Sequence, residues 1–222
     1  MADYSKLDHW SLKAQKEGYP ARSVYKLKEM DEKFGLLKVN PSRRHSFRVL
    51  DLGAAPGSWS LYVLRKISGP HTASVDGQGG IEGRGPSLVS VDLSPLSRQY
   101  DQGLFDKNDF LFLQGDFTLP EIRETILSHG PYNLLVSDAA PATSGNRTVD
   151  TLRSLDLAET ALYYAETALV KGGNMVIKVF QGGDTASLLK KIRGFFETGK
   201  SFKPQACRAE SFETYYLGLG KK

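Results

Sequence analysis

Cysteine is almost absent from this sequence. Cys207 is the only cysteine among 222 residues, so no disulfide can form within the chain and a cysteine-based metal site is not expected. The four histidines, His9, His45, His71 and His129, show no spacing typical of metal ligands, and we predict no metal. A chain without disulfides suits a reducing compartment, and we expect a cytoplasmic protein.

Long hydrophobic runs are also absent. No apolar stretch approaches the ~20 residues that a membrane-spanning helix needs. The first 18 residues contain no signal-peptide core and carry too many acidic residues for a typical transit peptide. The length fits a single domain over residues 1–222, in which we expect flexible chain within residues 1–20.

The net charge of +4 conceals an uneven distribution along the chain. Residues 1–48 carry 11 Lys and Arg against 6 Asp and Glu, and residues 186–222 carry 8 against 3. Residues 49–185 carry 10 against 16, so two basic ends flank an acidic centre. If the ends meet on one face, they form a surface for a polyanion around an acidic pocket; ordinary solvated charge is the alternative.

The stretch FRVLDLGAAPGSWS, residues 47–60, organises the rest of the chain. Residues 47–52 are apolar and favour a buried strand, residues 53–57 form a turn of small residues, and residues 58–67 have the pattern of an amphipathic helix. Strand, glycine turn and helix together are typical of nucleotide binding, because glycines allow close approach to the backbone and the helix N-terminus offers free N–H groups.

Strands and helices alternate along the remaining sequence. Further strands are expected at residues 87–93, 109–114, 132–137, 174–180, 200–208 and 213–219. Helices are expected at residues 21–35, 119–129, 148–170 and 184–197, with an apolar stripe on the longest that includes Leu152. Residues 69–87 are rich in glycine and predict a surface insertion. The alternation indicates an α/β fold with a mainly parallel sheet and helices on both faces.

Three acidic residues follow strands of this predicted sheet. Asp92, Asp116 and Asp138 each end or follow a strand, and ligands of such sheets bind beyond the carboxyl ends of the strands. Ala55 and Ser58 stand where a dinucleotide fingerprint requires glycine, which disfavours a nicotinamide dehydrogenase. Carboxylates would repel a pyrophosphate but attract the sulfonium and ammonium groups of S-adenosylmethionine, so we predict that cofactor.

Seven sequence motifs follow one another over about residues 14–220, and they read AQKEGYPARSVYKL, VLDLGAAPGSWS, VDLSPL, LQGDF, VSDAAPATSG, VIKVFQG and SFETYYL. In their order and spacing they resemble the FtsJ/RrmJ family of RNA ribose 2′-O-methyltransferases. The resemblance implies a Rossmann-like S-adenosylmethionine-dependent methyltransferase fold with a seven-stranded, mainly parallel sheet whose last strand is antiparallel. Bacterial ribosomal RNA members often carry Met and Asn where this chain has Ala139 and Ala142.

The same resemblance assigns candidate site residues. The family's Lys-Asp-Lys-Glu catalytic set falls on Lys26, Asp138, Lys178 and Glu213. Without the resemblance, Lys26 and Glu213 would be interpreted as surface charges. The implied cofactor contacts are Gly53, Gly57, Trp59, Asp92, Asp116 and Asp138, although Trp59 fits equally well as a packing residue.

Lys178 is the candidate to accept or orient the proton of the attacking ribose hydroxyl. A lysine acts as a base only when neutral, so a purely orienting charge remains an alternative. Of Tyr215 and Tyr216, which alternate in a strand, one is expected in the core and the other near the substrate.

The expected function is methylation of RNA, with a uridine of large-subunit (23S-type) ribosomal RNA as the leading substrate. The alternatives are a tRNA ribose methyltransferase and a cofactor-binding RNA scaffold without turnover. We expect a monomer that binds RNA through a basic rim composed of Arg22, Lys38, Arg43, Arg44 and Arg208.

Overall fold

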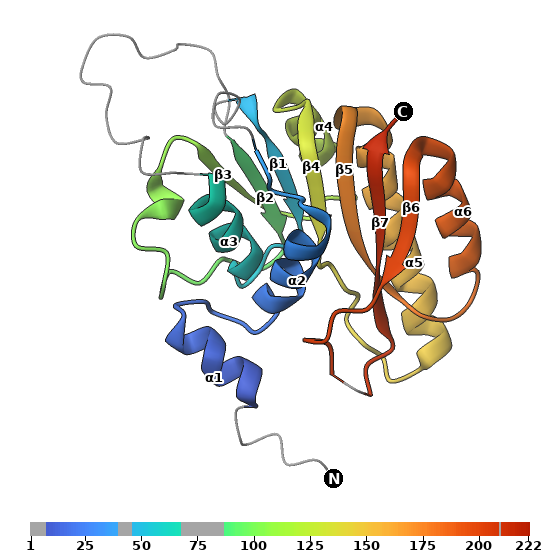
Figure 1. Cartoon of the computed structure of the whole chain (residues 1–222), viewed down its shortest axis with the longest axis horizontal. Helices are drawn as coiled ribbons and strands as arrows, with labels where there is room; N and C mark the ends of the chain where they lie inside the picture. The colour runs from blue at the N-terminus through green and yellow to red at the C-terminus, as the bar shows by residue number, and fades with distance from the viewer. Residues whose placement is uncertain (1–7, 40–45, 68–86, 209) are drawn as a thin grey trace.

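The computed structural model describes residues 8–39, 46–67, 87–208 and 210–222, and a seven-stranded sheet forms its centre (Figure 1). The strand order is β3-β2-β1-β4-β5-β7-β6, and β7 alone runs antiparallel to its neighbours. The predicted α/β fold with an antiparallel last strand is therefore confirmed. The strands are β1 (Val49–Leu52), β2 (Leu88–Asp92), β3 (Phe110–Gln114), β4 (Tyr132–Ser137), β5 (Leu169–Phe180), β6 (Phe196–Phe202) and β7 (Glu213–Lys221).

Helices cover both faces of the sheet, as Figure 1 shows. One layer consists of α1, α2 and α3, and the other of α4, α5 and α6. The helices are α1 (His9–Lys16), α2 (Val24–Phe34), α3 (Ser58–Ile67), α4 (Pro120–Ser128), α5 (Arg147–Ala168) and α6 (Thr185–Phe195), and a short 3₁₀ turn, η3, spans Leu104–Asp106.

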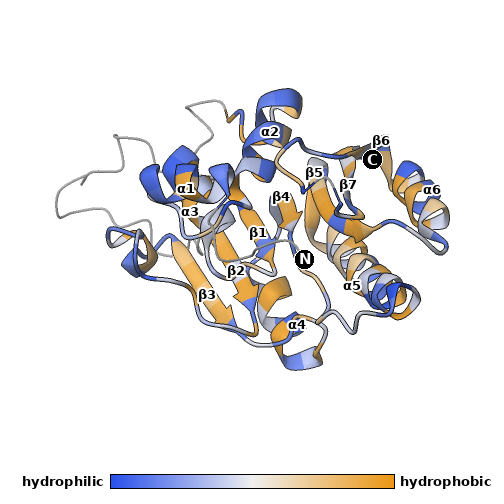
Figure 2. Cartoon of the chain, turned by 90° about the horizontal axis from the view of Figure 1, so that it is seen from below, coloured by the Kyte–Doolittle hydropathy of each residue, from blue (hydrophilic) through white to orange (hydrophobic). Residues whose placement is uncertain are grey.

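The hydrophobic core lies in two layers, one on each face of the sheet. On β4, Leu134 and Val136 pack with α2 and α3, whereas Leu135 between them packs with α4, α5 and α6. This alternation follows from the two-residue period of a strand. Figure 2 shows the result as apolar strands enclosed by helices whose outer faces are hydrophilic. Both faces of the central strands are buried, so these strands appear in the sequence as continuous apolar runs.

Local sequence signals account for the ends of the first two helices. The Asp8 side chain accepts a hydrogen bond from the Ser11 N–H and caps α1. Gly35 adopts a left-handed conformation with φ of 67° and ends α2. Helix α1 at His9–Lys16 falls within residues 1–20, and the expectation of flexible chain in that range stays a prediction.

Two predicted boundaries and one predicted apolar stripe need correction. The strand expected at residues 200–208 is instead β6, which starts directly after α6 ends at Phe195. The helix expected from residue 21 begins at Val24. On α5, Leu152 is exposed, because the helix turns Thr151 and Ser154 toward the sheet and the Ser154 hydroxyl accepts the Phe180 N–H at 3.0 Å. A polar pair therefore replaces the apolar stripe at the start of this helix.

Two further expectations concern the glycine-rich segment and membrane-spanning helices. The glycine-rich segment 69–87 lies, except for Ser87, outside the described residues. Among the helices of the described residues, none has the length and apolar character required to cross a membrane. The last strand in the chain, β7, lies between β5 and the edge strand β6.

Candidate active site

The turn between β1 and α3 packs closely against the end of β4. Gly53 has φ of 76°, and a Cβ there would lie only 2.5 Å from the Ala139 Cα, so neither the backbone conformation nor the space permits a side chain. Asp92, at the end of β2, accepts the Ala55 N–H at 2.9 Å and the Ser94 N–H at 2.8 Å. The small-residue turn is thus fixed from both sides at the carboxyl edge of the sheet.

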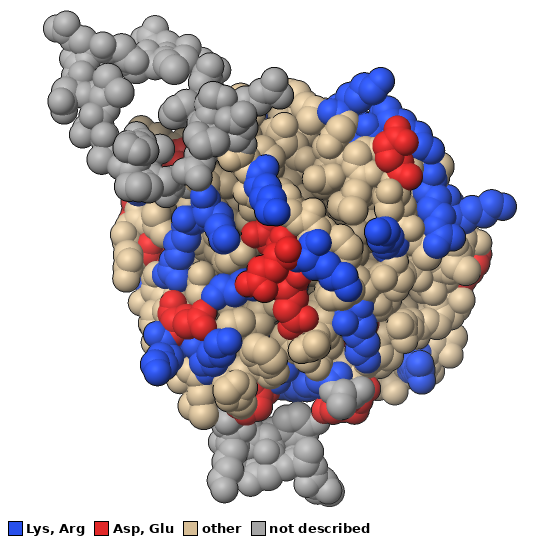
Figure 3. Space-filling model, viewed as in Figure 1, with Lys and Arg blue, Asp and Glu red and all other residues tan. Residues whose placement is uncertain are grey.

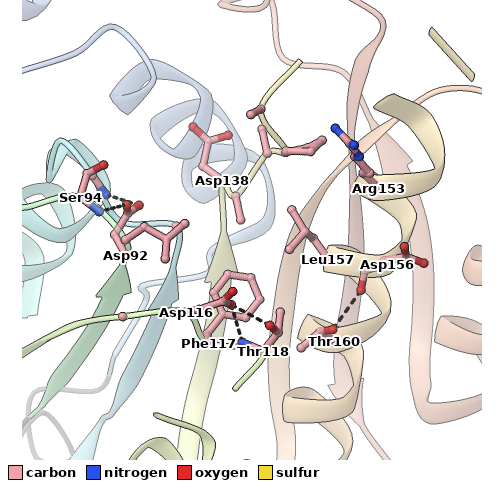
Figure 4. A pocket seen from close by; sticks show the side chains of 18 residues that line it. Asp92, Ser94, Asp116, Phe117, Thr118, Asp138, Arg153, Asp156, Leu157 and Thr160 are labelled. Atoms are coloured by element: carbon pink, nitrogen blue, oxygen red, sulfur yellow. Dashed lines mark hydrogen bonds between the residues drawn. The ribbon is translucent and has the colours of Figure 1, made fainter. Parts of the chain in front are cut away.

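A cavity of ≈ 740 Å³ opens at this edge (Figure 4). Carboxylates from three strand ends, Asp92, Asp116 and Asp138, line it together with Gly53. The opposite wall is one face of α5, whose residues Arg153, Asp156, Leu157 and Thr160 recur at helical spacing. The strand-end aspartates that the sequence predicted to meet therefore do share one cavity, and its negative charge suits a cationic ligand.

Two residues proposed as cofactor contacts do not line this cavity. Trp59 is buried, its indole N–H donates to the Ser23 carbonyl at 2.8 Å, and its ring packs 5.9 Å from that of Tyr215. A Cβ on Gly57 would face Phe105 on the other side of the turn. The packing interpretation of Trp59 is the one that fits this geometry.

Asp138 and Lys178 form a close pair at the rim of the cavity. The Lys178 Nζ lies 2.5 Å from the Asp138 carbonyl oxygen and 3.2 Å from its Oδ1. The Tyr215 hydroxyl donates to the same Oδ1 at 2.6 Å. Burial opposes ionisation of Asp138, but Lys178, Lys26 and the tyrosine hydroxyl outweigh it and lower the pKa of this carboxyl. Asp138 is therefore an anion held by fixed donors.

Lys26 and Glu213 complete the group. The Lys26 Nζ lies 2.7 Å from the Glu213 Oε1, and both side chains are largely buried. The Lys26 ammonium also lies 5.9 Å from the centre of the Tyr215 ring. Burial disfavours its charge, but Asp138 and Glu213 outweigh burial and raise the pKa of Lys26. The structure thus brings Lys26, Asp138, Lys178 and Glu213, here called the tetrad, to one place around Tyr215.

The N-terminal and C-terminal parts of the chain are also held together by hydrogen bonds outside the tetrad. Glu29, one turn after Lys26 on α2, accepts the Gln205 N–H at 2.7 Å and the Ala206 N–H at 2.8 Å. Arg22 donates to the Ala206 carbonyl at 2.6 Å and pairs with Asp8. The segment between β6 and β7 is therefore attached to α2, and Arg22, proposed as an RNA contact, is used inside the protein.

The other residues of the proposed basic rim divide into two groups. Lys38 is exposed just after α2, and Arg208 lies between β6 and β7, where it has contacts within the chain. Arg43 and Arg44 lie outside the described residues. Figure 3 shows basic side chains spread over the face of α1, α2 and α3, with acidic side chains among them. The RNA-binding role of this rim stays a prediction.

Sequence reasoning missed a buried polar cluster beneath the turn. Asp51 on β1 is fully buried, and its Oδ2 accepts the Ser60 hydroxyl at 2.7 Å, while the Ser60 and Ser90 hydroxyl oxygens are 3.0 Å apart. The Asp51 Oδ1 has no hydrogen-bond partner among the residues that the structure describes. Burial raises the pKa of Asp51 to about 7, the negative charges of Asp138 and Asp92 add to the rise, and the Ser60 hydrogen bond opposes it. The sequence feature that could have predicted this cluster is Asp51 itself, an acidic residue inside an otherwise apolar strand.

The cavity fits the cofactor that the sequence predicted. A Cβ would fill the cradle at Gly53, the cavity wall carries carboxylates for the cationic groups of S-adenosylmethionine, and Asp92 ends β2, where a carboxylate can accept ribose hydroxyls. Among the described residues, no three His, Cys, Asp or Glu side chains gather in a way that could hold a metal ion.

Comparison with known proteins identifies close relatives of this chain. This chain is 48% identical to the ribosomal RNA large subunit methyltransferase E of Treponema denticola over 219 residues. The aligned region covers 99% of this chain and 97% of that protein. The protein of the same name from Oleidesulfovibrio alaskensis is 42% identical over 217 residues, which cover 97% of this chain and 92% of the relative.

Solved structures agree on the fold. A ribosomal RNA methyltransferase of Plasmodium falciparum superimposes with a TM-score of 0.65 at 22% identity, over 91% of this chain and 98% of that one. A family model described as FtsJ-like methyltransferase matches residues 19–221, which include the whole tetrad. Members of this family take their methyl group from S-adenosylmethionine, in agreement with the acidic cavity. The chain therefore belongs to the FtsJ-like methyltransferase family.

Proposed function

We propose that this enzyme methylates the ribose 2′-hydroxyl of a uridine in large-subunit ribosomal RNA. The observation that carries the proposal is the buried tetrad at the rim of the acidic cavity, with two lysines paired to two carboxylates around Tyr215. The names of the relatives from Treponema denticola and Oleidesulfovibrio alaskensis support ribosomal RNA over transfer RNA as substrate.

The residues of this chain would divide the work as follows. S-adenosylmethionine supplies an activated methyl group when bound, so the protein has to hold the nucleophile in line and manage one proton. Asp92, Asp116 and Asp138 would hold the cofactor in the cavity. Lys178 would accept or orient the proton of the ribose hydroxyl, because Asp138 holds its side-chain nitrogen at the rim of the cavity through two contacts.

The Lys26–Glu213 pair would determine the charges that surround Asp138 and Lys178. Lys26 keeps its proton, since its pKa is raised, and offers a fixed positive charge beside Asp138. A monomer as the working unit is part of the proposal. A substrate in the ribosome implies a cytoplasmic enzyme, and this location is part of the proposal.

The test is a methyl-transfer assay with a labelled methyl donor. The acceptors are large ribosomal subunits from cells that lack the gene, free ribosomal RNA, and transfer RNA. We expect label in large-subunit RNA. After alkaline hydrolysis the label should remain in an uncleaved dinucleotide, because a methylated 2′-oxygen cannot attack the neighbouring phosphate. Mapping of the 2′-O-methyl marks in cells with and without the gene would locate the uridine. Label confined to transfer RNA, or no transfer to any acceptor, would overturn the proposal.

A further inference from the structure

Arg147, the first residue of α5, lies over one ring of an aromatic pair at the edge of the sheet that carries the tetrad. Its guanidinium carbon lies 5.3 Å from the centre of the Phe212 ring. The rings of Phe212 and Phe180 meet edge to face with their centres 4.6 Å apart. Figure 1 shows the start of α5 and the connection between β6 and β7 together at the lower edge of the molecule. Three segments that are distant in sequence thus form one stack.

Strands β5 and β7 connect the group of Arg147, Phe212 and Phe180, here called the stack, to the tetrad. Phe180 follows Lys178 by two residues on β5, so their side chains leave the same face of the strand about 6.6 Å apart. Phe180 is paired with Glu213 in the sheet register, and Phe212 directly precedes Glu213. The Gln181 N–H donates to the Phe212 carbonyl at 2.8 Å and extends the pairing of the strands. The position of the stack relative to the candidate reaction site is therefore fixed by backbone hydrogen bonds.

The guanidinium of Arg147 is available to a ligand. The residue is exposed, and within the part of the chain that the structure describes it makes no hydrogen bond or ion pair. This distinguishes it from Arg22, which is paired with Asp8 and the Ala206 carbonyl. The Phe212 ring lies within cation–π range of the guanidinium, and the exposed side chain leaves its N–H donors to solvent.

An arginine in this setting matches the chemistry of a nucleotide. Its outer face can stack on a nucleobase, and its N–H groups can bind a phosphate as a fork. We propose that Arg147, Phe212 and Phe180 form a subsite for an RNA nucleotide adjacent to the target ribose, here called the Arg147 subsite. This inference rests on the proposed function, which brings an RNA strand to the tetrad beside the stack.

Direct binding measurements test the subsite. The probe is a short fluorescein-labelled oligoribonucleotide, whose affinity for the full chain is measured by anisotropy over a series of salt concentrations. Arg147→Ala should weaken binding about tenfold and reduce the salt slope by ~0.7, the value for one phosphate contact on a single strand. Phe212→Ala should weaken binding several-fold without changing the slope, because it removes only the stacking support. Arg147→Lys should keep the slope but not the affinity.

Lys190 provides the matched control, because it is exposed on α6 and its change to alanine also removes one positive charge. Equal affinity of Arg147→Ala and Lys190→Ala, or full affinity of Arg147→Lys, would overturn the subsite. Methyl transfer by the unaltered enzyme is measured in parallel. If the unaltered enzyme methylates RNA but Arg147→Ala does not change RNA affinity, only the subsite is refuted. If RNA affinity depends on Arg147 but no methyl transfer occurs, only the proposed function is refuted.

Discussion

Lys26 on α2 and Glu213 on β7 form a buried ion pair in which Nζ and Oε1 are 2.7 Å apart. The two residues come from opposite ends of the chain, and their side chains retain only 11% and 13% exposure. Buried pairs of this kind contribute little net stability, because desolvation offsets the attraction. Their effect here is to fix the position of α2 relative to β7, and thereby the position of the charges around Asp138.

Lys178 should be indispensable for methyl transfer. Lys178→Ala removes the group that faces the Asp138 carbonyl and carboxylate, and we expect a loss of ~10²–10⁴-fold in kcat with cofactor affinity retained. Lys178→Arg should fail as well, because a guanidinium keeps its proton. Single-turnover rates and calorimetry with S-adenosylmethionine measure the two effects. Lys171→Ala, an exposed lysine on the same strand, is the control, and a fully active arginine variant would show that Lys178 acts only through its charge.

Glu29 should act as a positioning residue for Lys26 and Glu213. Glu29→Gln exchanges an acceptor of two backbone N–H groups for an amide that can accept only one of them well, so the segment between β6 and β7 loses part of its attachment to α2. We expect kcat to fall about tenfold while the Kd for S-adenosylmethionine is unchanged, since Glu29 is absent from the cavity wall.

The control for this prediction is Glu32→Gln, because Glu32 is exposed on the same helix. Glu29→Asp should restore part of the lost rate, since it retains the carboxylate. If Glu29→Gln and Glu32→Gln are equally active, the attachment of this segment does not influence the tetrad.

Tyr215→Phe should change how activity depends on pH. The hydroxyl donates to the Asp138 Oδ1 at 2.6 Å and helps to lower the pKa of Asp138, so its removal should raise that pKa. Since the aspartate must be ionised to hold Lys178, the acid limb of the kcat profile should move to higher pH in the variant. Tyr216→Phe, at the next position and on the opposite face, should leave the profile in place. Identical profiles for wild type and Tyr215→Phe would contradict the role of the hydroxyl.

Asp92→Ala should weaken cofactor binding by about 1.5–3 kcal/mol, the range for hydrogen bonds to a charged group. The change removes a carboxylate from the cavity and also leaves the N–H groups of Ala55 and Ser94 without their acceptor. Calorimetry with S-adenosylmethionine measures the loss, and Glu124→Ala on the exposed face of α4 controls for general charge effects. Unchanged affinity would remove Asp92 from the set of cofactor residues.

Asp51→Asn should stabilise the protein at neutral and alkaline pH. The pKa of Asp51 is raised from 3.8 to about 7 by burial, so the folded state favours the neutral carboxyl. Its contribution to stability is fully present below the unfolded pKa near 3.8 and is lost as the pH rises through 7. The isosteric amide cannot ionise and escapes this loss, which amounts to a few kcal/mol at ~1.4 kcal/mol per pKa unit.

Urea unfolding of the wild type and of Asp51→Asn at several pH values checks this prediction. The difference in unfolding free energy should grow from pH 4 to above pH 7 and then level off. A difference that does not depend on pH would mean that Asp51 titrates normally in the folded protein.

Local features of the fold were determined by the sequence alone. The turn after β1, the helix α3 and the three strand-end aspartates were predicted correctly, because each depends on a short pattern of apolar spacing, glycines and strand ends. The four tetrad residues were assigned only through the resemblance of the motifs to a known family, because the residue patterns alone left Lys26 and Glu213 as surface charges. The turn, the helix and the strand ends needed no knowledge of which distant segments touch.

Tertiary structure decided the features that depend on contacts between distant segments. The start of β6 at Phe196 carries no turn signal, and residues 205 and 206 leave the sheet because their N–H groups bind Glu29. Tertiary contacts also decided the position of Trp59, which packs in the core away from the cavity, and the contact of the Tyr215 hydroxyl with Asp138. A side chain's partner across the fold is set by packing between layers, and a one-dimensional pattern of residues does not encode that distance.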